Sequence, residues 1–218
     1  MDTLGNIFHM NFLVYIHWFI SIRIYQMRNH SISVDQARYA TSIVAKYLDT
    51  ATVKTSTKFY KTTFPSNTIF IRSYASTSDE KIEKLTREFN IHFRACIGSF
   101  IYLLSTREDL IFAVHKLAQF LSKPGKVHFE GMVHLLRYIR YNKTLELKYC
   151  SNIDDAPLSN MLKQASNKTK NQFMAFCDSS LKDFPNTGRS AGAYIIFYQG
   201  GPTDHGTHVS GPVSQSSA

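Results

Sequence analysis

The chain contains 218 residues, of which 44% are apolar and 13% are aromatic. This composition allows one large domain or two small ones around a buried core, and it excludes a chain that is disordered throughout. Lysine and arginine total 25 against 16 acidic residues, a net charge of +9, and residues 93–150 alone carry nine bases and four acids. The excess favours a polyanionic partner, although a cationic surface that only confers solubility fits it equally well.

The most apolar segment, residues 7–24, is open to two interpretations. It has the length of a membrane anchor, but polar residues interrupt it and no basic segment precedes it. In its second half Trp18, Ile20, Ile22 and Ile24 fall on one face and His17, Ser21 and Arg23 on the other, and a period of two is typical of a strand. We therefore expect a strand and no membrane contact. The three widely spaced cysteines fit a reducing compartment, either the cytoplasm or the nucleus.

The first elements expected are two strands and a helix. Residues 15–26 and 31–34 predict an antiparallel pair around a turn-forming Arg-Asn-His tripeptide. Ser33 and Gln36 have the spacing of a capping box, in which each side chain satisfies a backbone N–H of the helix start. This spacing predicts a helix that begins beside them and ends near residues 48–49.

After a long connection over residues 50–80, three helices are predicted from residue 82 onwards. The apolar positions at helical spacing fall in three successive groups, Phe93, Ile97, Ile101 and Leu104, then Leu110, Val114, Leu117 and Leu121, then Phe129, Met132, Val133, Leu136 and Ile139. Pro124-Gly125 separates the second group from the third. A strand is expected over residues 145–150.

The polar side of the third predicted helix carries His134, Arg137 and Arg140, with Lys143 just beyond it. A basic, aromatic-edged helix face suits contact with phosphates. An ordinary solvated face of a packed helix is equally consistent with the same residues. Together with Trp18, these four residues are the candidate nucleic-acid contacts.

The last part of the chain predicts a linker and three strands. Residues 151–171 are polar and poor in aromatics, as expected of a linker. Strands are predicted over residues 173–178, 192–199 and 207–213, with a Gly-Gly-Pro turn at 200–202 between the second and the third.

Three stretches, in family order, resemble copia-type retrotransposon polyproteins. YIHWFISIRI…SISVDQARYATSIVAKYL is similar to the family's hairpin and following helix, and Gln36 and Tyr39 match it. FRACIGSFIYLLSTREDLIFAVHKLAQFLSKP…H…LLRYIR resembles a long, distinctive block, matched at Arg94, Gly98, Tyr102, Thr106, Arg107, Asp109, Ala113, Val114, Pro124, His128, Arg137 and Tyr138. FCDSSLKDFPNTGRSAGAYIIFYQGGP resembles the opening of the family's RNase H domain, matched at Asp178, Asp183, Arg189, Ser190, Gly192 and Gly201. Departures stand at Glu108, Phe129, Ser180 and Leu181, where the family has Pro, Trp, Asp and Trp.

The resemblance implies an α+β fold in three parts. Residues 1–150 are expected to be the C-terminal part of a reverse-transcriptase region, a primer-grip-like β-hairpin followed by thumb- and connection-like helices. Residues 151–171 are then a linker, and residues 172–218 an incomplete RNase H-like mixed sheet. The family's two active sites each hold Mg²⁺ through several carboxylates. In this sequence Asp178 alone matches such a ligand position, as a residual catalytic and metal position.

We therefore expect a truncated, catalytically inactive polyprotein fragment that does not retain Mg²⁺. Its expected partner is an RNA–DNA hybrid or another nucleic acid, bound weakly and without sequence preference, and no small-molecule substrate is indicated. The alternatives are an RNase H-type hydrolase, active only when the missing half is supplied, and a small membrane-anchored protein. Asp154-Asp155 suits a solvated turn rather than a polymerase dyad. The segment 204–208 has two histidines but no nearby cysteine, which does not favour zinc.

Overall fold

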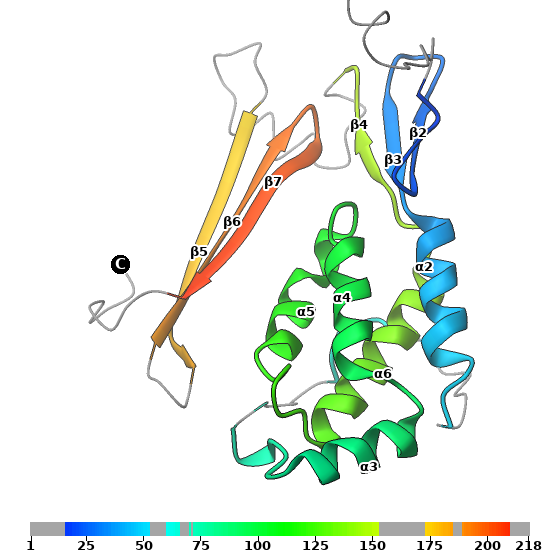
Figure 1. Ribbon diagram of the computed structural model, residues 1–218. Coiled ribbons are helices and arrows are strands. Elements are labelled where there is room, and N and C mark those ends of the chain that lie inside the picture. Colours follow the sequence, from blue (N-terminus) through cyan, green and yellow to red (C-terminus); the bar gives the residue numbers. More distant parts are fainter. Residues whose placement is uncertain are drawn as a thin grey trace, which may run out of the picture.

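The computed structural model describes residues 16–52, 60–65, 70, 72–152, 173–184 and 189–209, with the backbone alone described for 72 and 180–184. The described part has a mixed α+β fold with five α-helices and two antiparallel sheets. The helices form one unit, a first sheet extends it at the end near α2, and a second sheet stands beside it (Figure 1).

The first sheet combines the predicted hairpin with the strand predicted after the helices, and both predictions are confirmed. Its antiparallel order is β1-β2-β3-β4, with the bounds β1 Trp18–Phe19, β2 Ile22–Gln26, β3 Ile32–Asp35 and β4 Leu147–Tyr149. A turn at Ile20 and Ser21, both with positive φ, divides the first predicted strand into β1 and β2. Among the described residues no helix is both long enough and apolar enough to cross a bilayer.

The helix after β3 begins later than the capping box predicted. Helix α2 (Ala37–Ile43) continues as the π-helical segment η1 (Val44–Leu48), so the predicted end is confirmed. Ser33 lies within β3, and the Oε1 atom of Gln36 accepts a hydrogen bond of 2.9 Å from the buried Thr106 hydroxyl. Instead, Asp35 Oδ1 accepts from the Ala37 N–H at 2.9 Å. The capping-box prediction is wrong because the partner of Gln36 lies 70 residues further along the chain.

The helical unit contains the core. Its elements are η2 Arg72–Tyr74, α3 Asp79–Phe89, α4 Phe93–Leu103, η3 Glu108–Leu110, α5 Ile111–Ala118 and α6 Lys126–Tyr141. All five apolar positions predicted for the third helix are buried in α6. In α4, however, Ile101 is 50% exposed and Phe100 takes its place in the core. With 3.6 residues per turn, position 100 returns closer to the face of Phe93 and Ile97 than position 101 does.

The second sheet is an antiparallel meander of three long strands in the order β5-β6-β7. Its strands are β5 Phe173–Phe184, β6 Arg189–Tyr198 and β7 Gly201–Val209. The first two predicted strands are confirmed in place but are shorter than β5 and β6. The third overlaps β7 at residues 207–209 alone, since β7 already begins at Gly201 and residues 210–213 lie outside the described part of the chain. The turn was predicted over residues 200–202, but it consists of Gln199 and Gly200, both with positive φ. Most of the predicted linker, residues 153–171, lies outside the described residues.

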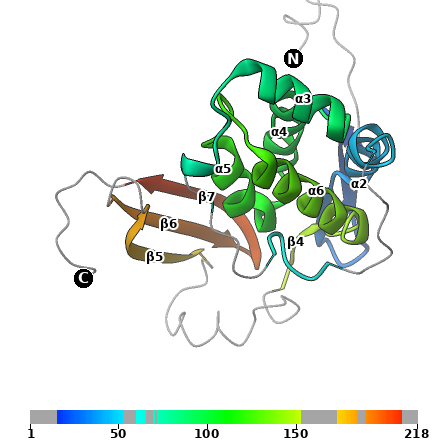
Figure 2. The ribbon, with the colours of Figure 1, turned by 90° about the horizontal axis from the view of Figure 1, so that it is seen from below.

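The second sheet is joined to the first at the end of β4. The Cys150 N–H donates to the Gln199 carbonyl at 2.8 Å, and the Tyr149 hydroxyl donates to the Pro202 carbonyl at 2.7 Å. Gly201 lies so close to Tyr149 that a Cβ atom on it would meet the ring at 2.6 Å. Seen from below, β7 runs beside α5 (Figure 2). The second sheet therefore packs against both β4 and the helices.

Candidate nucleic-acid interface

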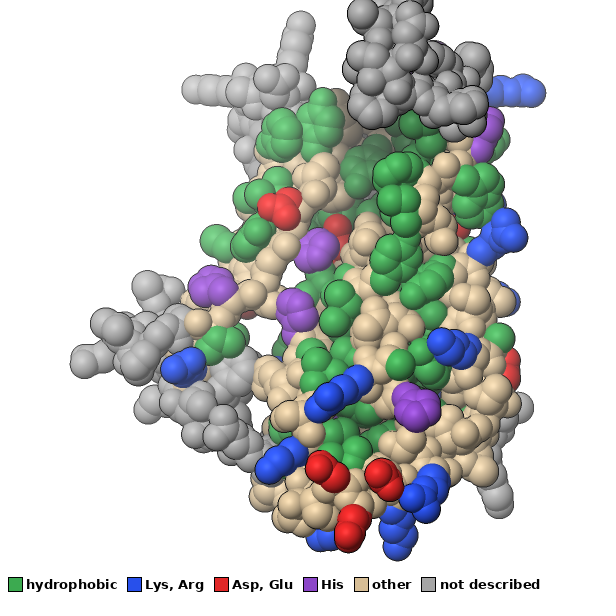
Figure 3. All heavy atoms as spheres, viewed as in Figure 1, with side chains coloured by type: hydrophobic (Ala, Val, Ile, Leu, Met, Phe, Trp, Pro, Cys, Tyr) green, Lys and Arg blue, Asp and Glu red, His purple; other side chains and the backbone are tan. Residues whose placement is uncertain are grey.

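The hairpin formed by β1 and β2 exposes a group of large apolar side chains. The exposed residues are Ile16, Trp18, Phe19, Ile20 and Tyr25. The φ of Ile20 is +46°, a conformation that is unusual for a β-branched residue. Its carbonyl accepts a hydrogen bond from the Tyr102 hydroxyl of α4, which fixes the turn against the helical unit. Apolar side chains gather over this region in the space-filling view (Figure 3).

A basic helix face continues from this hairpin. The guanidinium of Arg38, in the first turn of α2, lies 5.2 Å from the centroid of the Trp18 ring. Lys46 follows two turns later and is exposed, as Arg38 is. A positively charged groove edge with an exposed aromatic ring is the combination that binds single-stranded nucleic acid through phosphates and stacked bases. Arg38 and Lys46 were not predicted, because the sequence shows the exposed face of α2 only as two isolated bases.

The predicted residues on α6 are engaged within the chain. His134 Nε2 lies 2.8 Å from the Thr62 carbonyl, and its ring packs edge-on against Tyr60. Arg137 donates to the Tyr60 hydroxyl at 3.0 Å, and Arg140 forms an ion pair with Asp49. The segment 60–64 thus covers part of the face that the helix pattern presents as solvated.

The structure does not gather the five predicted contacts at one place. Trp18 contacts the start of α2, whereas the Asp49 that holds Arg140 follows the end of η1. The 12 residues from Ala37 to Leu48 separate these points by roughly 18 Å. Lys143, just beyond α6, is exposed. Nucleic-acid contact by these residues therefore stays a prediction. Trp18 is exposed, whereas His134, Arg137 and Arg140 contact other parts of the chain.

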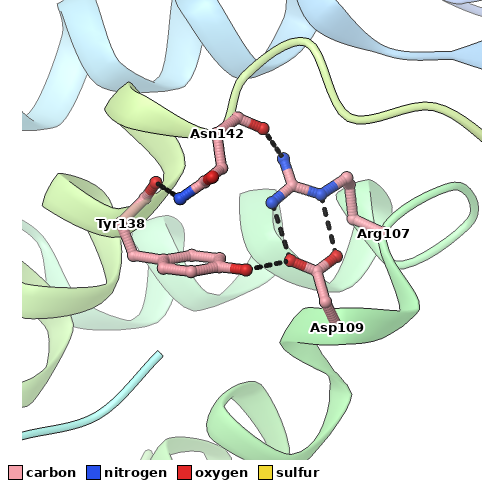
Figure 4. Close-up of polar contacts among 4 residues, drawn as sticks. All are labelled: Arg107, Asp109, Tyr138 and Asn142. Atoms are coloured by element: carbon pink, nitrogen blue, oxygen red, sulfur yellow. Dashed lines mark hydrogen bonds and ion pairs between the residues drawn. The ribbon is translucent and has the colours of Figure 1, made fainter. Parts of the chain in front are cut away.

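Two residues of the long motif block form an ion pair between a buried guanidinium and a partly exposed carboxylate, whose side chain is 32% exposed (Figure 4). Arg107 is 2% exposed and donates from Nε and Nη2 to the two carboxylate oxygens of Asp109, both at 2.8 Å. The third guanidinium nitrogen donates to the Asn142 carbonyl, and the Tyr138 hydroxyl donates to Asp109 at 2.9 Å. Burial, and then Asp109, raises the pKa of Tyr138. These motif positions tie η3 to the end of α6 and serve packing.

His128, another motif position, is fully buried. Its ring stacks on Phe120 with centroids 3.9 Å apart, and Phe70 packs at 5.3 Å. The Gly125 N–H donates to Nδ1 at 2.8 Å, which requires that nitrogen to be unprotonated. Burial lowers the pKa of His128 to about 4. The residue is a neutral core histidine at the start of α6.

This burial predicts a loss of stability in acid. Between the ordinary histidine pKa of 6.5 and about 4, the unfolded chain binds a proton that folded His128 does not, so stability falls as the pH drops through this range. Both chains in the test carry Glu108→Gln, because Glu108 titrates in the opposite sense. As the pH drops through this range, the urea unfolding midpoint should fall less in the chain that also carries His128→Gln than in the chain that keeps His128. A stability difference between them that is independent of pH would contradict the prediction.

Glu108 stands where the resembled family has proline, and it begins η3. Its Oε1 atom lies 3.4 Å from His205 Nδ1 on β7, and the side chain is 12% exposed. Burial, and then the neighbouring Asp109 and Asp204, raise its pKa to about 7. The departure from the family pattern thus places a titratable contact between the helical unit and the second sheet.

Asp178 does not have the surroundings of a magnesium site. Its exposed side chain accepts from the Ser179 N–H at 2.8 Å and lines a cavity beside α5, where it is the one carboxylate among the lining residues. No three or more His, Cys, Asp or Glu side chains come together as a metal site within the described residues. A pair of hydrated Mg²⁺ ions needs several oxygen ligands, so the residues around Asp178 do not fit the ions.

The two discarded metal motifs remain without support. Asp154-Asp155 lies outside the described residues. His205 and His208 both lie in β7, and an odd separation places their side chains on opposite faces of a strand. His205 faces Glu108, whereas the ring of His208 lies over Gly192.

The chain has partial similarity to transposon proteins. It is 38% identical over 47 residues to a retrovirus-related Pol polyprotein from transposon RE1 of Arabidopsis thaliana, covering 22% of this chain and 3% of that protein. It is 24% identical over 111 residues to the putative transposon Ty5-1 protein YCL074W of Saccharomyces cerevisiae, covering 50% and 31%. It is also 34% identical over 61 residues to secreted RxLR effector protein 161 of Plasmopara viticola, covering 28% and 43%.

The chain spans less than half of the length of each of these relatives. No family model matches the chain, and no solved structure matches it significantly. The similarities to transposon proteins support a transposon-related origin.

Proposed function

We propose that this chain is a nucleic-acid-binding part of a copia-type retrotransposon polyprotein, from the reverse-transcriptase and RNase H regions. The partial similarity to transposon proteins supports the origin. The hairpin and helices correspond to the primer-grip- and thumb-like region, and the second sheet to the start of an RNase H-like domain. The function is binding, because the surroundings of Asp178 do not fit the magnesium pair that the family's chemistry uses.

One observation carries the proposal, which is the exposed Trp18 ring beside the Arg38 guanidinium at 5.2 Å. An aromatic platform accepts bases of any sequence by stacking, and a neighbouring arginine adds phosphate contact and cation–π attraction. Lys46 extends the cationic edge along α2. The net charge of +9 adds long-range attraction for a polyanion.

The proposal predicts salt-dependent binding that the fluorescence of Trp18 reports directly, since it is the one tryptophan of the chain. Titration with a single-stranded oligonucleotide should quench this fluorescence. Replacing Arg38 and Lys46 with alanine should make the slope of log affinity against log salt shallower by about 1.4, because each phosphate contact contributes roughly 0.7. Trp18→Ala, followed by the anisotropy of a labelled strand, should weaken binding by about 1–3 kcal/mol.

The matched control is a double alanine variant of Lys81 and Lys84, which removes the same charge from α3. It should leave the slope nearly unchanged. A third arm replaces Arg137 and Arg140, whose intramolecular contacts predict a larger effect on stability than on affinity. Binding that ignores salt, or equal slopes for the α2 and α3 variants, would rule out the proposed interface.

A further inference from the structure

Helix α5 turns an unusually polar face toward the second sheet. Phe112, His115, Lys116 and Gln119 recur at i, i+3, i+4 and i+7, the spacing that places side chains on one face of a helix. A helix face that packs on a sheet is normally apolar at these positions. Here the polar side chains line a cavity of about 400 Å³ between the helix and the sheet.

The sheet leaves this space because its facing residues are small. Ala193 is paired with Asp178 on β5 and with Thr207 on β7, so the three side chains share one face of the sheet. Ala191 and Ala193 reach only a short way toward α5. The His115 ring meets the Thr207 hydroxyl and spans the gap at one point. The space-filling view shows openings between the sheet and the helices, bordered by histidine side chains (Figure 3).

The groups around the cavity differ in chemistry. Phe112 is 57% exposed, and the Lys116 ammonium lies 5.4 Å from its ring centroid. Asp178 Oδ1 accepts from Ser179, and Oδ2 is the acceptor offered to a ligand. Burial, and then His205, lowers the pKa of His115, so Lys116 supplies the positive charge of the cavity near neutral pH.

We infer that this cavity binds one nucleotide, either free or within a single strand, with its base against Phe112, a base amine on Asp178 and its phosphate on Lys116. The volume lies within the range of roughly 300–1,000 Å³ that is typical of small-molecule sites. A flat base with donors and acceptors at its edge suits an aromatic wall beside a carboxylate, and a phosphate suits an ammonium. The inference goes beyond the hairpin interface and does not depend on it.

Isothermal titration with adenosine 5′-monophosphate tests this site, with adenosine and ribose 5-phosphate as separate probes of the base and the phosphate. The monophosphate should bind more tightly than either part. Lys116→Glu should weaken its binding by about tenfold or more and affect adenosine less. Ala193→Leu, which fills the cavity, should abolish binding of all three. Lys123→Glu changes the same charge on an exposed residue outside the cavity lining and should leave binding intact.

Circular dichroism establishes that each variant is folded. If Ala193→Leu does not fold, Lys116→Glu alone decides the test. No heat of binding at millimolar monophosphate, or binding that is unchanged in Lys116→Glu, would overturn the inference. Competition between the monophosphate and a single-stranded oligonucleotide distinguishes a free nucleotide from one within a strand. If the cavity variants still bind the oligonucleotide, the proposed function remains supported. If the chain binds the monophosphate but no oligonucleotide, the inference about the cavity remains supported and the proposed function is wrong.

Discussion

Replacing Asp109 with asparagine is expected to destabilise the folded chain by about 1–3 kcal/mol. The substitution keeps the shape of the side chain but removes the countercharge of the Arg107 guanidinium, which is 2% exposed, whereas the Asp109 side chain is 32% exposed. It also weakens the acceptor of the Tyr138 hydroxyl. A buried charge without a partner is among the most costly defects in a protein interior. Urea unfolding followed by far-UV circular dichroism measures the change.

The double substitution Arg107→Met and Asp109→Asn separates pairing from packing. Removing both charges should recover part of the stability that Asp109→Asn loses, because no unpaired charge remains. Glu83→Gln is the matched control, since Glu83 and Arg87 form an ion pair at the surface of α3 with side chains 69% and 80% exposed. Its expected cost is below about 0.5 kcal/mol. Equal costs at the two pairs would refute the prediction that the pair with the buried Arg107 stabilises the fold more than a surface pair does.

Replacing Gly125 with alanine is expected to cost about 3 kcal/mol or more. The added Cβ atom would lie 1.7 Å from the backbone oxygen of Tyr74. The segment that contains Tyr74 is held in place by Ser76. The Ser76 N–H donates a hydrogen bond to the Lys123 carbonyl, and its hydroxyl donates one to the Pro124 carbonyl. The φ of Gly125 is −100°, so the cost arises from the close approach and not from the backbone conformation.

Gly98→Ala provides the opposite control within α4. Apart from the chain neighbours and the backbone of its own helix, no atom lies within 4 Å of the position of its Cβ, and the residue is in the interior of a helix. Alanine there should stabilise the chain by about 0.5–1 kcal/mol, since it reduces the freedom of the unfolded chain. Thermal unfolding should therefore move in opposite directions in the two variants. A Gly125→Ala chain as stable as the wild type would show that η2 does not pack on the start of α6.

The sequence predicted the elements whose periodicity is local. The apolar stripe of α6 was complete, because a 16-residue amphipathic helix repeats its pattern several times. The predicted start of β7 lies six residues too late, at residue 207 instead of Gly201. Gly201, Pro202 and Gly206 disfavour a strand by their residue type, and their pairing with β6 places them in one. Local propensity yields to tertiary context at such positions.

The candidate site was harder to predict, since solvent exposure depends on partners distant in sequence. Arg140 and His134 read as solvated on a helical wheel, yet Asp49 and Thr62 hold them. Trp18 was among the predicted contacts, but alternation groups it with Ile20, Ile22 and Ile24, and its exposure becomes visible only in the folded hairpin. Arg38 was missed because its relation to Trp18 requires the hairpin to fold back beside α2.

The two glycines at the start of β7 are required for separate reasons, and this has an evolutionary consequence. Gly200 adopts a φ of +78°, which only the turn demands. Gly201 instead leaves room for the Tyr149 ring and the Lys148 carbonyl, which lie more than 50 positions earlier in the chain. A substitution at position 201 should therefore require a smaller residue at position 149 together with a small shift of the backbone at Lys148. Positions 149 and 201 should covary among relatives, whereas position 200 should vary independently of both.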